Sequence, residues 1–262
     1  MRLALVFLII SNWAWATDTS VLVYNITQDQ VEYGRRDQQV RAIASVTKVM
    51  TAIVVLDQNP NMIETLKLSR RVASNLPQQQ YSRRDLITAM LVRSDNAAAE
   101  TLAENYPGGR QAFISDMNRH AHQFMMQHTQ FEDPTGLGRL NLSTAQDVSI
   151  MMTRALNYDM IRDTSTRLSA QFETQSRKKK RVISLPNTNQ PLLGAFSNIL
   201  VSKTGLTSAA GWCVSMVVQH GSERYAVVIL GAGSREVRTS TAKHMINDLL
   251  TAQKNTEYPS FL

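Results

Sequence analysis

Residues 43–57 read "IASVTKVMTAIVVLD" and combine one polar pair with a long apolar run. Ser45 and Lys48 stand at the front of the run, and no further charged residue occurs until Asp57. This pattern predicts a buried helix that begins at Ser45. Because residues three apart share one face of a helix, the Ser45 and Lys48 side chains are expected to be neighbours. Two interpretations follow: a buried helix with a lysine reaching out of its first turn, or a nucleophile beside its base.

The first 16 residues have the pattern of a secretory signal peptide. Arg2 supplies a positive start, residues 3–10 are an unbroken apolar run, and residues 14–16 (Ala-Trp-Ala) form a small-x-small cleavage site. The apolar run is too short to span a bilayer, and no later stretch predicts an integral membrane segment. We therefore expect cleavage after residue 16 and a periplasmic mature protein of residues 17–262.

The composition is that of an ordinary globular protein, with 43% hydrophobic and 19% charged residues, and 262 residues are enough to bury a large core. The formal net charge is +7, and the densest basic run is residues 177–181. No aromatic residues interleave with this run, so it indicates a solvated hairpin tip and no nucleic-acid partner. The single cysteine, Cys213, can form no internal disulfide, and its apolar neighbours indicate a core position.

Strand patterns occur at both ends of the chain. Residues 20–26 and 31–36 predict an N-terminal hairpin, and a helix is expected at 235–252. The further strands expected are 167–175, 181–186, 199–204, 211–219 and 224–231. The fold class is therefore predicted to be α+β: one antiparallel sheet built from both chain ends, flanked by helices, with an inserted all-helical lobe.

The middle of the chain predicts several helices. Ser82 and Asp85 form a capping box at the start of one helix, and Ser143 with Gln146 is expected to cap another at residues 144–156. Further helices are expected at 97–106 and 110–124, and residues 131–141 ("FEDPTGLGRLN") are expected to form a loop.

The Ser-x-x-Lys pattern is weak by itself, because it also occurs from Ser176 and from Ser240. The setting of Ser45 distinguishes it: a serine at a helix start lies near unpaired backbone N–H groups and the positive end of the helix dipole. Burial of Lys48 among apolar neighbours would lower its pKa, as a lysine base requires. A hydroxyl nucleophile needs such a partner.

Two further motifs accompany this pair. Ser94-x-Asn96 interrupts a helical region, where the Ser94 hydroxyl can relay a proton and the Asn96 amide can bind a carbonyl; alone, it is more simply a helix N-cap. Residues 203–205 (Lys-Thr-Gly) end a strand and offer a charge, a hydroxyl and a close backbone approach; alone, they are more simply a strand and a turn. The three motifs together, in this order, indicate an active-site cleft.

On these motifs the chain resembles the penicillin-interacting serine acyltransferases, which comprise D,D-peptidases, transpeptidases and serine β-lactamases. The resemblance spans residues 20–250, and "SVTKVMTAIVVLD", "SDNAAAETLAENYPGG" and "SKTGLTSAAGWC" are most similar to low-molecular-mass penicillin-binding proteins. The "YPGG" at 106–109, the "NTN" at 187–189 and the "GWC" at 211–213 are similar to the D-alanyl-D-alanine endopeptidase branch (the penicillin-binding protein 7 type). The resemblance implies a β-lactamase/transpeptidase-like fold.

The resemblance also implies roles for individual residues, with Ser45 as nucleophile and Lys48 as base. Leu206 would act only through its main chain. The implied site consists of the catalytic Ser45, Lys48 and Ser94, the substrate-binding Asn96, Lys203, Thr204 and Gly205, and the oxyanion-hole amides of Ser45 and Leu206. Arg235 and Arg238 remain open between a second contact for the substrate carboxylate and surface charges at a helix start. No cofactor is expected. No metal is expected either, because His120 and His122 point apart on their predicted helix.

The function implied is a serine D,D-endopeptidase that hydrolyses D-alanyl cross-links in peptidoglycan through an acyl-enzyme, with β-lactams as covalent inhibitors. The chain ends soon after Gly205, which leaves no room for the C-terminal β-domain of the carboxypeptidase relatives. A D-alanyl-D-alanine carboxypeptidase remains an alternative. A β-lactamase is disfavoured, because Glu132 is followed by Asp-Pro-Thr where those enzymes have Glu-x-x-Leu-Asn. A non-catalytic wall-binding protein is the third possibility.

Overall fold

The computed structural model describes residues 18–176 and 179–252. The predicted signal peptide and residues 177–178, which belong to the basic run, lie outside the described residues. At the centre is a five-stranded antiparallel sheet in the order β2-β1-β11-β10-β9. Its strands are β1 (Ser20–Asn25), β2 (Gln30–Arg35), β9 (Ile199–Thr207), β10 (Gly211–His220) and β11 (Glu223–Ala232). The sheet is thus built from both ends of the chain, as predicted.

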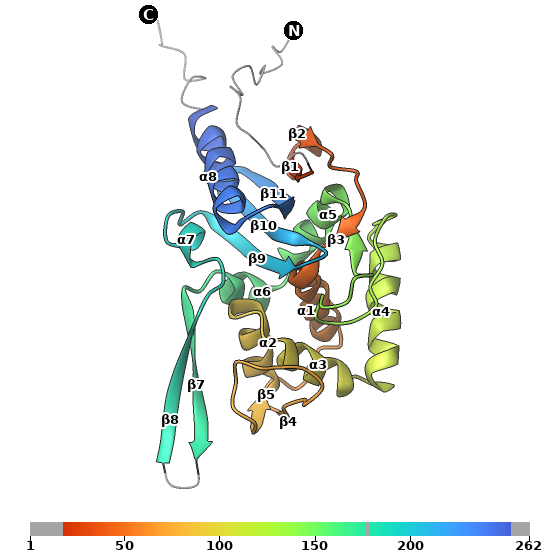
Figure 1. Cartoon of the computed structure of the whole chain (residues 1–262), viewed down its shortest axis with the longest axis vertical. Coiled ribbons are helices and arrows are strands. Elements are labelled where there is room, and N and C mark those ends of the chain that lie inside the picture. Colours follow the sequence, from red (N-terminus) through yellow and green to blue (C-terminus); the bar gives the residue numbers. More distant parts are fainter. Residues whose placement is uncertain (1–17, 177–178, 253–262) are drawn as a thin grey trace, which may run out of the picture.

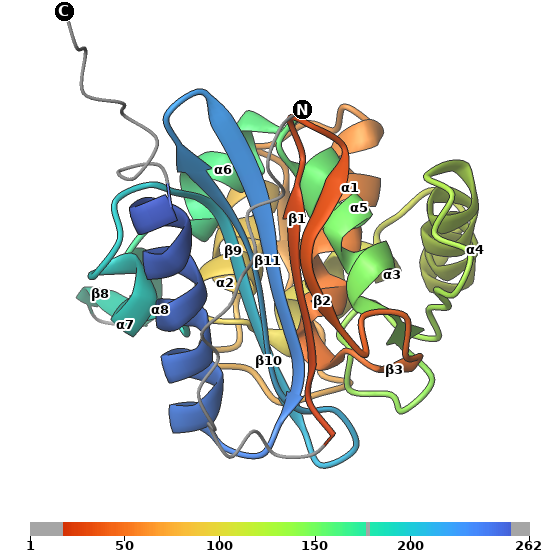
Figure 2. The ribbon, with the colours of Figure 1, turned by 90° about the horizontal axis from the view of Figure 1, so that it is seen from above.

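Both faces of this sheet are covered by helices (Figure 2). Helix α8 (Arg235–Ala252) packs on one face against β10 and β11, and α5 (Ala145–Ala155) packs on the other. Side chains of β10 alternate between the two layers: Val214 and Met216 pack with α8, while Cys213 faces the opposite core. Burial on both faces explains why this strand is an almost continuous apolar run.

The helical part of the chain surrounds α1 (Lys48–Asp57), whose residues from Lys48 to Val55 are all buried. The predicted start of this helix needs correction: Ser45 lies in a short 3-10 turn, Ala44–Thr47, and the α-helix begins at Lys48. Ala44 has a φ of +47°, which an L residue rarely adopts, so the chain bends sharply just before Ser45. The remaining helices are α2 (Arg83–Val92), α3 (Asn96–Glu104), α4 (Gly109–Gln123), α6 (Asp159–Ser165) and α7 (Gln190–Leu193).

Three strand pairs lie outside the main sheet: β3 (Arg41–Ala42) with β6 (Leu142–Ser143), β4 (Thr65–Lys67) with β5 (Gln80–Ser82), and β7 (Ser169–Ser176) with β8 (Lys179–Pro186). The strands predicted at 167–175 and 181–186 are therefore real but do not join the sheet. They form a hairpin that projects away from it (Figure 1). An alternating pattern identifies a strand, but it does not identify the partner strand.

The two predicted helix caps have different outcomes. Ser82 caps α2 as expected, because its Oγ accepts a hydrogen bond of 3.0 Å from the Asp85 amide. The cap of α5 is Thr144 and not Ser143: Thr144 Oγ1 accepts from the Asp147 amide at 3.0 Å, while Ser143 ends β6. Within the described part of the chain, no helix has the length and apolar character needed to cross a membrane.

Candidate active site

Ser45 and Lys48 lie side by side at the N-terminal end of α1. The Lys48 Nζ is 2.9 Å from the Ser45 Oγ, 2.8 Å from the Asn96 Oδ1, and also donates to the Thr135 carbonyl. The Lys48 side chain is 0% exposed, yet its ammonium group has three oxygen partners. A single lysine thus joins the turn that contains Ser45, the start of α3 and the 131–141 loop.

Burial changes the acid–base behaviour of Lys48. Removal from water lowers the pKa of Lys48 from 10.5 to about 7, although the nearby carboxylates of Asp133, Asp95 and Glu100 act in the opposite direction. A lysine with this pKa is about half neutral at pH 7, and the neutral form can accept a proton. The prediction of a desolvated lysine beside Ser45 is therefore confirmed.

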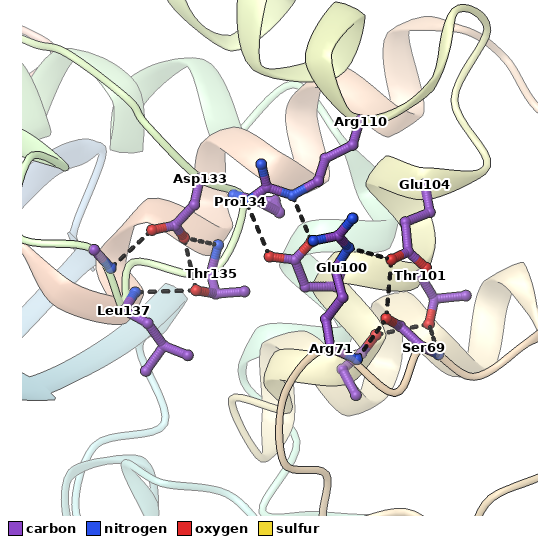
Figure 3. Close-up of polar contacts among 12 residues, drawn as sticks. Ser69, Arg71, Glu100, Thr101, Glu104, Arg110, Asp133, Pro134, Thr135 and Leu137 are labelled. Carbon is purple, nitrogen blue, oxygen red and sulfur yellow. Dashed lines mark hydrogen bonds and ion pairs between the residues drawn. The ribbon is translucent and has the colours of Figure 1, made fainter.

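Asp133 organises the loop whose Thr135 carbonyl accepts from Lys48. Figure 3 shows the contacts between Asp133 and this loop. Asp133 Oδ1 accepts from the Thr135 amide at 2.6 Å, the Thr135 hydroxyl at 2.6 Å and the Gly136 amide at 2.7 Å. Its Oδ2 accepts from the Gly138 amide at 2.7 Å and from Asn141 Nδ2 at 2.8 Å. Burial alone would raise the pKa of Asp133, but these donors outweigh it and leave the pKa below its usual value.

Two glycines allow the backbone around Ser45 to be packed closely. A Cβ on Gly136, which has a φ of +79°, would lie 1.9 Å from the Ala44 carbonyl oxygen and 2.9 Å from the Ser45 amide nitrogen. A Cβ on Gly205 would lie 3.0 Å from the same Ser45 nitrogen. The glycine of the Lys-Thr-Gly motif thus brings β9 against the Ser45 amide. This contact also brings the next residue of β9, Leu206, to the cleft, although its side chain is 49% exposed.

The second motif occupies the connection between α2 and α3. Ser94 has a φ of +64°, and both Ser94 and Asn96 line the same cleft as Ser45. The residue between them is the helix cap: Asp95 Oδ1 accepts from the Ala98 amide at 2.9 Å. Asp95 caps the helix, while Ser94 and Asn96 line the cleft. The Ser94 hydroxyl has no hydrogen-bond partner among the described residues.

The third motif lies on β9. Lys203 is 1% exposed and donates to the Thr204 carbonyl at 2.9 Å, while the Thr204 hydroxyl donates to the Thr188 hydroxyl at 2.6 Å. Burial, followed by the positive charges of Lys48 and Arg238, holds the pKa of Lys203 well below its usual value. A negatively charged ligand next to Lys203 would relieve this repulsion.

The motifs meet in one cleft of about 770 Å³. Arg238, whose role the sequence left open, lines it with Trp212; the guanidinium carbon of Arg238 lies 5.6 Å from the centre of the indole ring. Arg238 is only 2% exposed, and its Nε has no hydrogen-bond partner among the described residues. Arg238 is therefore a buried charge at the cleft and not a surface charge.

Three features that shape this site lie outside the motifs that the sequence displays. The Thr135 carbonyl is a backbone atom and carries no residue-type signal. Asn75 and Arg93 line the cleft beside the second motif, but neither belongs to the three motifs. Glu132, the residue considered for a β-lactamase, uses its Oε1 to accept from the Leu140 amide at 2.6 Å and so stabilises the loop.

The arrangement of Ser45 and Lys48 defines a class of protein. A serine hydroxyl beside a buried lysine, at the edge of an antiparallel sheet and open to a cleft, is the arrangement of a serine hydrolase with a lysine as base. The chain belongs to the peptidase family S11, described as D-alanyl-D-alanine carboxypeptidase, whose model matches residues 12–234. The resemblance found in the motifs is thereby confirmed at the level of the family.

Curated relatives agree with this membership. A D-alanyl-D-alanine endopeptidase of Pseudomonas aeruginosa is 33% identical over 242 residues, covering 89% of this chain and 77% of that protein. A D-alanyl-D-alanine endopeptidase of Escherichia coli K12 is 33% identical over 239 residues, covering 86% of this chain and 75% of that protein.

Solved structures share the fold. The DD-transpeptidase of Streptomyces K15 matches with a TM-score of 0.81 at 25% identity, covering 87% of this chain and 94% of that one. Penicillin-binding protein D2 of Listeria monocytogenes, in its ampicillin-bound form, matches with a TM-score of 0.79 at 29% identity, covering 90% and 98%. The predicted α+β, transpeptidase-like fold is thereby confirmed.

Proposed function

We propose that this protein is a serine D,D-endopeptidase that cleaves D-alanyl cross-links of peptidoglycan through an acyl-enzyme on Ser45. The observation that carries the proposal is the 2.9 Å contact between Ser45 Oγ and the Nζ of a fully buried Lys48. The choice of endopeptidase is supported by the relatives of that name at 33% identity. The choice of substrate is supported by the buried positive charges at the cleft.

The first half of the reaction forms an ester. Neutral Lys48 takes the hydroxyl proton of Ser45 as Oγ attacks the D-alanyl carbonyl carbon, and the carbonyl electron pair moves onto oxygen. The Ser45 and Leu206 amides stabilise this oxyanion. The carbon–nitrogen bond then breaks, and the amine leaves with the proton held by Lys48, relayed by the Ser94 hydroxyl.

The second half restores the enzyme. Water attacks the ester carbonyl with Lys48 again as the base, the carbon–Oγ bond breaks, and Ser45 regains its proton. Asn96 binds the carbonyl of the acylating peptide. The carboxylate beside the scissile bond lies against Lys203 and Arg238, and the Thr204 hydroxyl turns from Thr188 to donate to it. The unpartnered Nε of Arg238 suits such an anion. β-Lactams present a comparable carbonyl and carboxylate, and they acylate Ser45 covalently in this proposal.

The test is digestion of purified muropeptides. We expect cross-linked dimers to be converted to monomers, and the Ser45→Ala variant to leave them intact. Loss of terminal D-alanine with dimers intact would instead identify a carboxypeptidase, the activity of the family description. Rapid catalytic turnover of a chromogenic cephalosporin would identify a β-lactamase. Failure of a β-lactam to add covalently to the wild-type protein would refute an acyl-enzyme mechanism altogether.

We also propose that the protein is exported to the periplasm, where its substrate lies. The pattern of residues 1–16 supports this proposal. The intact mass of the protein recovered from a periplasmic extract tests it: a chain that begins at residue 17 is expected, and an uncleaved chain in the cytoplasm contradicts it.

A further inference from the structure

The cleft that contains Ser45 is lined by three arginines and, within the described part of the chain, by no acidic residue. Arg235 and Arg238 come from α8, which packs on the sheet. Arg93 follows the last residue of α2, in the helical part of the molecule (Figure 1). None of the three forms an ion pair with a described residue. The exposed Glu236 carboxylate acts electrostatically on Arg235 and Arg238 without forming an ion pair with either, so the described lining of the cleft carries a net positive charge.

One carboxylate does not account for all of this charge. Lys203, Thr204 and Arg238 already serve the carboxylate beside the scissile bond in the proposed reaction. Thr188 separates them from Arg93: its hydroxyl accepts from Thr204, and its amide donates to the Val92 carbonyl at 3.1 Å. Arg93 is thus a second positive centre, on the helical side of the cleft.

The protein holds Arg93 in a defined place. Its amide donates to the Ala89 carbonyl at 3.0 Å, and its Nε lies 3.5 Å from Asn75 Oδ1. Asn75 is itself fixed, because its amide donates to Asp95 Oδ2 at 2.6 Å. The two Nη groups of Arg93 have no partner among the described residues, which leaves the end of the guanidinium free for a planar anion.

A purely structural role would be a favourable interaction with the C-terminus of α2, where Arg93 is the capping residue. That role accounts for a basic residue at this position. It does not account for a side chain that lines the cleft and is oriented by a second cleft residue, Asn75.

We propose that Arg93, oriented by Asn75, is a second carboxylate-binding site of the cleft. It selects peptides that carry a carboxylate in addition to the one beside the scissile bond. This inference rests on the proposed peptidase function and specifies its substrate as a doubly anionic peptide.

The test uses two D-alanyl peptides that differ at one position, where a side-chain carboxylate is either free or converted to a primary amide. We expect wild-type kcat/KM to favour the free carboxylate about tenfold, as a charge-assisted hydrogen bond provides. Arg93→Gln should reduce this ratio to about one, through loss on the free-carboxylate peptide alone. Arg93→Lys should retain part of it.

Arg84→Gln is the matched control, because it removes one positive charge from α2, the helix that Arg93 follows, at a separate hollow of the surface. It should leave the ratio unchanged. The proposal is overturned if Arg93→Gln retains the wild-type ratio, or if it slows both peptides equally with a lower melting temperature, as a helix-capping role predicts.

Acylation of Ser45 by benzylpenicillin separates this proposal from the peptidase function. If neither peptide is cleaved while benzylpenicillin still acylates, the peptidase proposal fails, and binding is then measured by competition. The concentration of each peptide that halves the acylation rate should still differ about tenfold in the wild type and not in Arg93→Gln. Equal competition by both peptides, or none from either, overturns the second carboxylate site.

Discussion

The Nζ of Lys48 lies 2.9 Å from the Oγ of Ser45, and the protein surrounds that lysine completely. Each of its three hydrogen-bond partners comes from a different part of the chain: the turn before α1, the start of α3, and the 131–141 loop. The position of Lys48 is therefore set by tertiary structure, and its proposed contribution as the base can be tested by changing any of these parts.

Replacement of Lys48 by methionine keeps the apolar stem and removes the base. We expect the rate of acylation by a fluorescent penicillin to fall about a thousandfold, which is within the range for loss of a general base. The measurement is the time course of adduct formation by intact-mass spectrometry, with Ser45→Ala as the blank. Acylation within tenfold of wild type would show that another group accepts the Ser45 proton.

The pH dependence of acylation follows from the lowered pKa of Lys48. Because only neutral lysine accepts a proton, the acylation rate should reach a plateau above a pKa of about 7 and fall tenfold per pH unit below it. The second-order rate constant for acylation by benzylpenicillin, measured from about pH 5 to about pH 9, gives this profile on both sides of neutrality. A midpoint near 10 would contradict a desolvated base.

Asp133→Asn should weaken both the loop and the base. Loss of the charged acceptor leaves buried amides poorly paired, so we expect about 3 kcal/mol lower stability and about 100-fold slower acylation. Because the Asp133 carboxylate opposes the lowering of the Lys48 pKa, its removal should move the midpoint of the pH profile to lower pH.

Glu132→Gln is the control for this change, since Glu132 is the adjacent carboxylate and contacts the Leu140 amide instead. Its midpoint should stay at the wild-type value. If the midpoint is unchanged in Asp133→Asn, the charge of Asp133 has no effect on the pKa of Lys48. Asp133 then only stabilises the loop. Thermal unfolding and the same pH series provide both measurements.

Two glycine substitutions can separate backbone strain from crowding. Gly109 and Gly136 both have positive φ, but a Cβ on Gly109 meets nothing within 4 Å, while one on Gly136 meets the Ala44 carbonyl at 1.9 Å. Gly109→Ala should cost about 1–2 kcal/mol and leave acylation intact. Gly136→Ala should lower the free energy of unfolding by about 1–3 kcal/mol more than Gly109→Ala does, and it should slow acylation by displacing Ser45. If the two substitutions change the acylation rate equally, the close contact between Gly136 and the backbone before Ser45 is contradicted.

Local signals predicted the elements of this fold better than their partners. The Ser82 cap and the helix at 235–252 follow from short-range pattern, and the structure has both. The hairpin of β7 and β8 was correctly expected as strands, but its separation from the sheet depends on long-range packing that alternation does not encode.

The same distinction holds at the cleft. Ser45, Lys48, Asn96 and the Lys-Thr-Gly motif could be found in the sequence because their residue types form recognisable short motifs. Arg93 could not be found in this way, because its proposed role depends on two tertiary contacts. These are the contact with Asn75 and the position of Thr188 between Arg93 and Thr204. Residue type alone also could not show that Arg238 is buried against Trp212.

Strand β1 lies between β2 and β11, and residue pairs such as Ser20 and Leu230 join nearly opposite ends of the chain. Gly205, from β9, is packed against the Ser45 amide. Ribosomal synthesis therefore delivers Ser45 long before the strands that complete its surroundings, and such distant pairings form slowly. A nascent or truncated chain that lacks β9 to β11 carries Ser45 without the strands that form its cleft, so the proposed activity can arise only after these strands have been made.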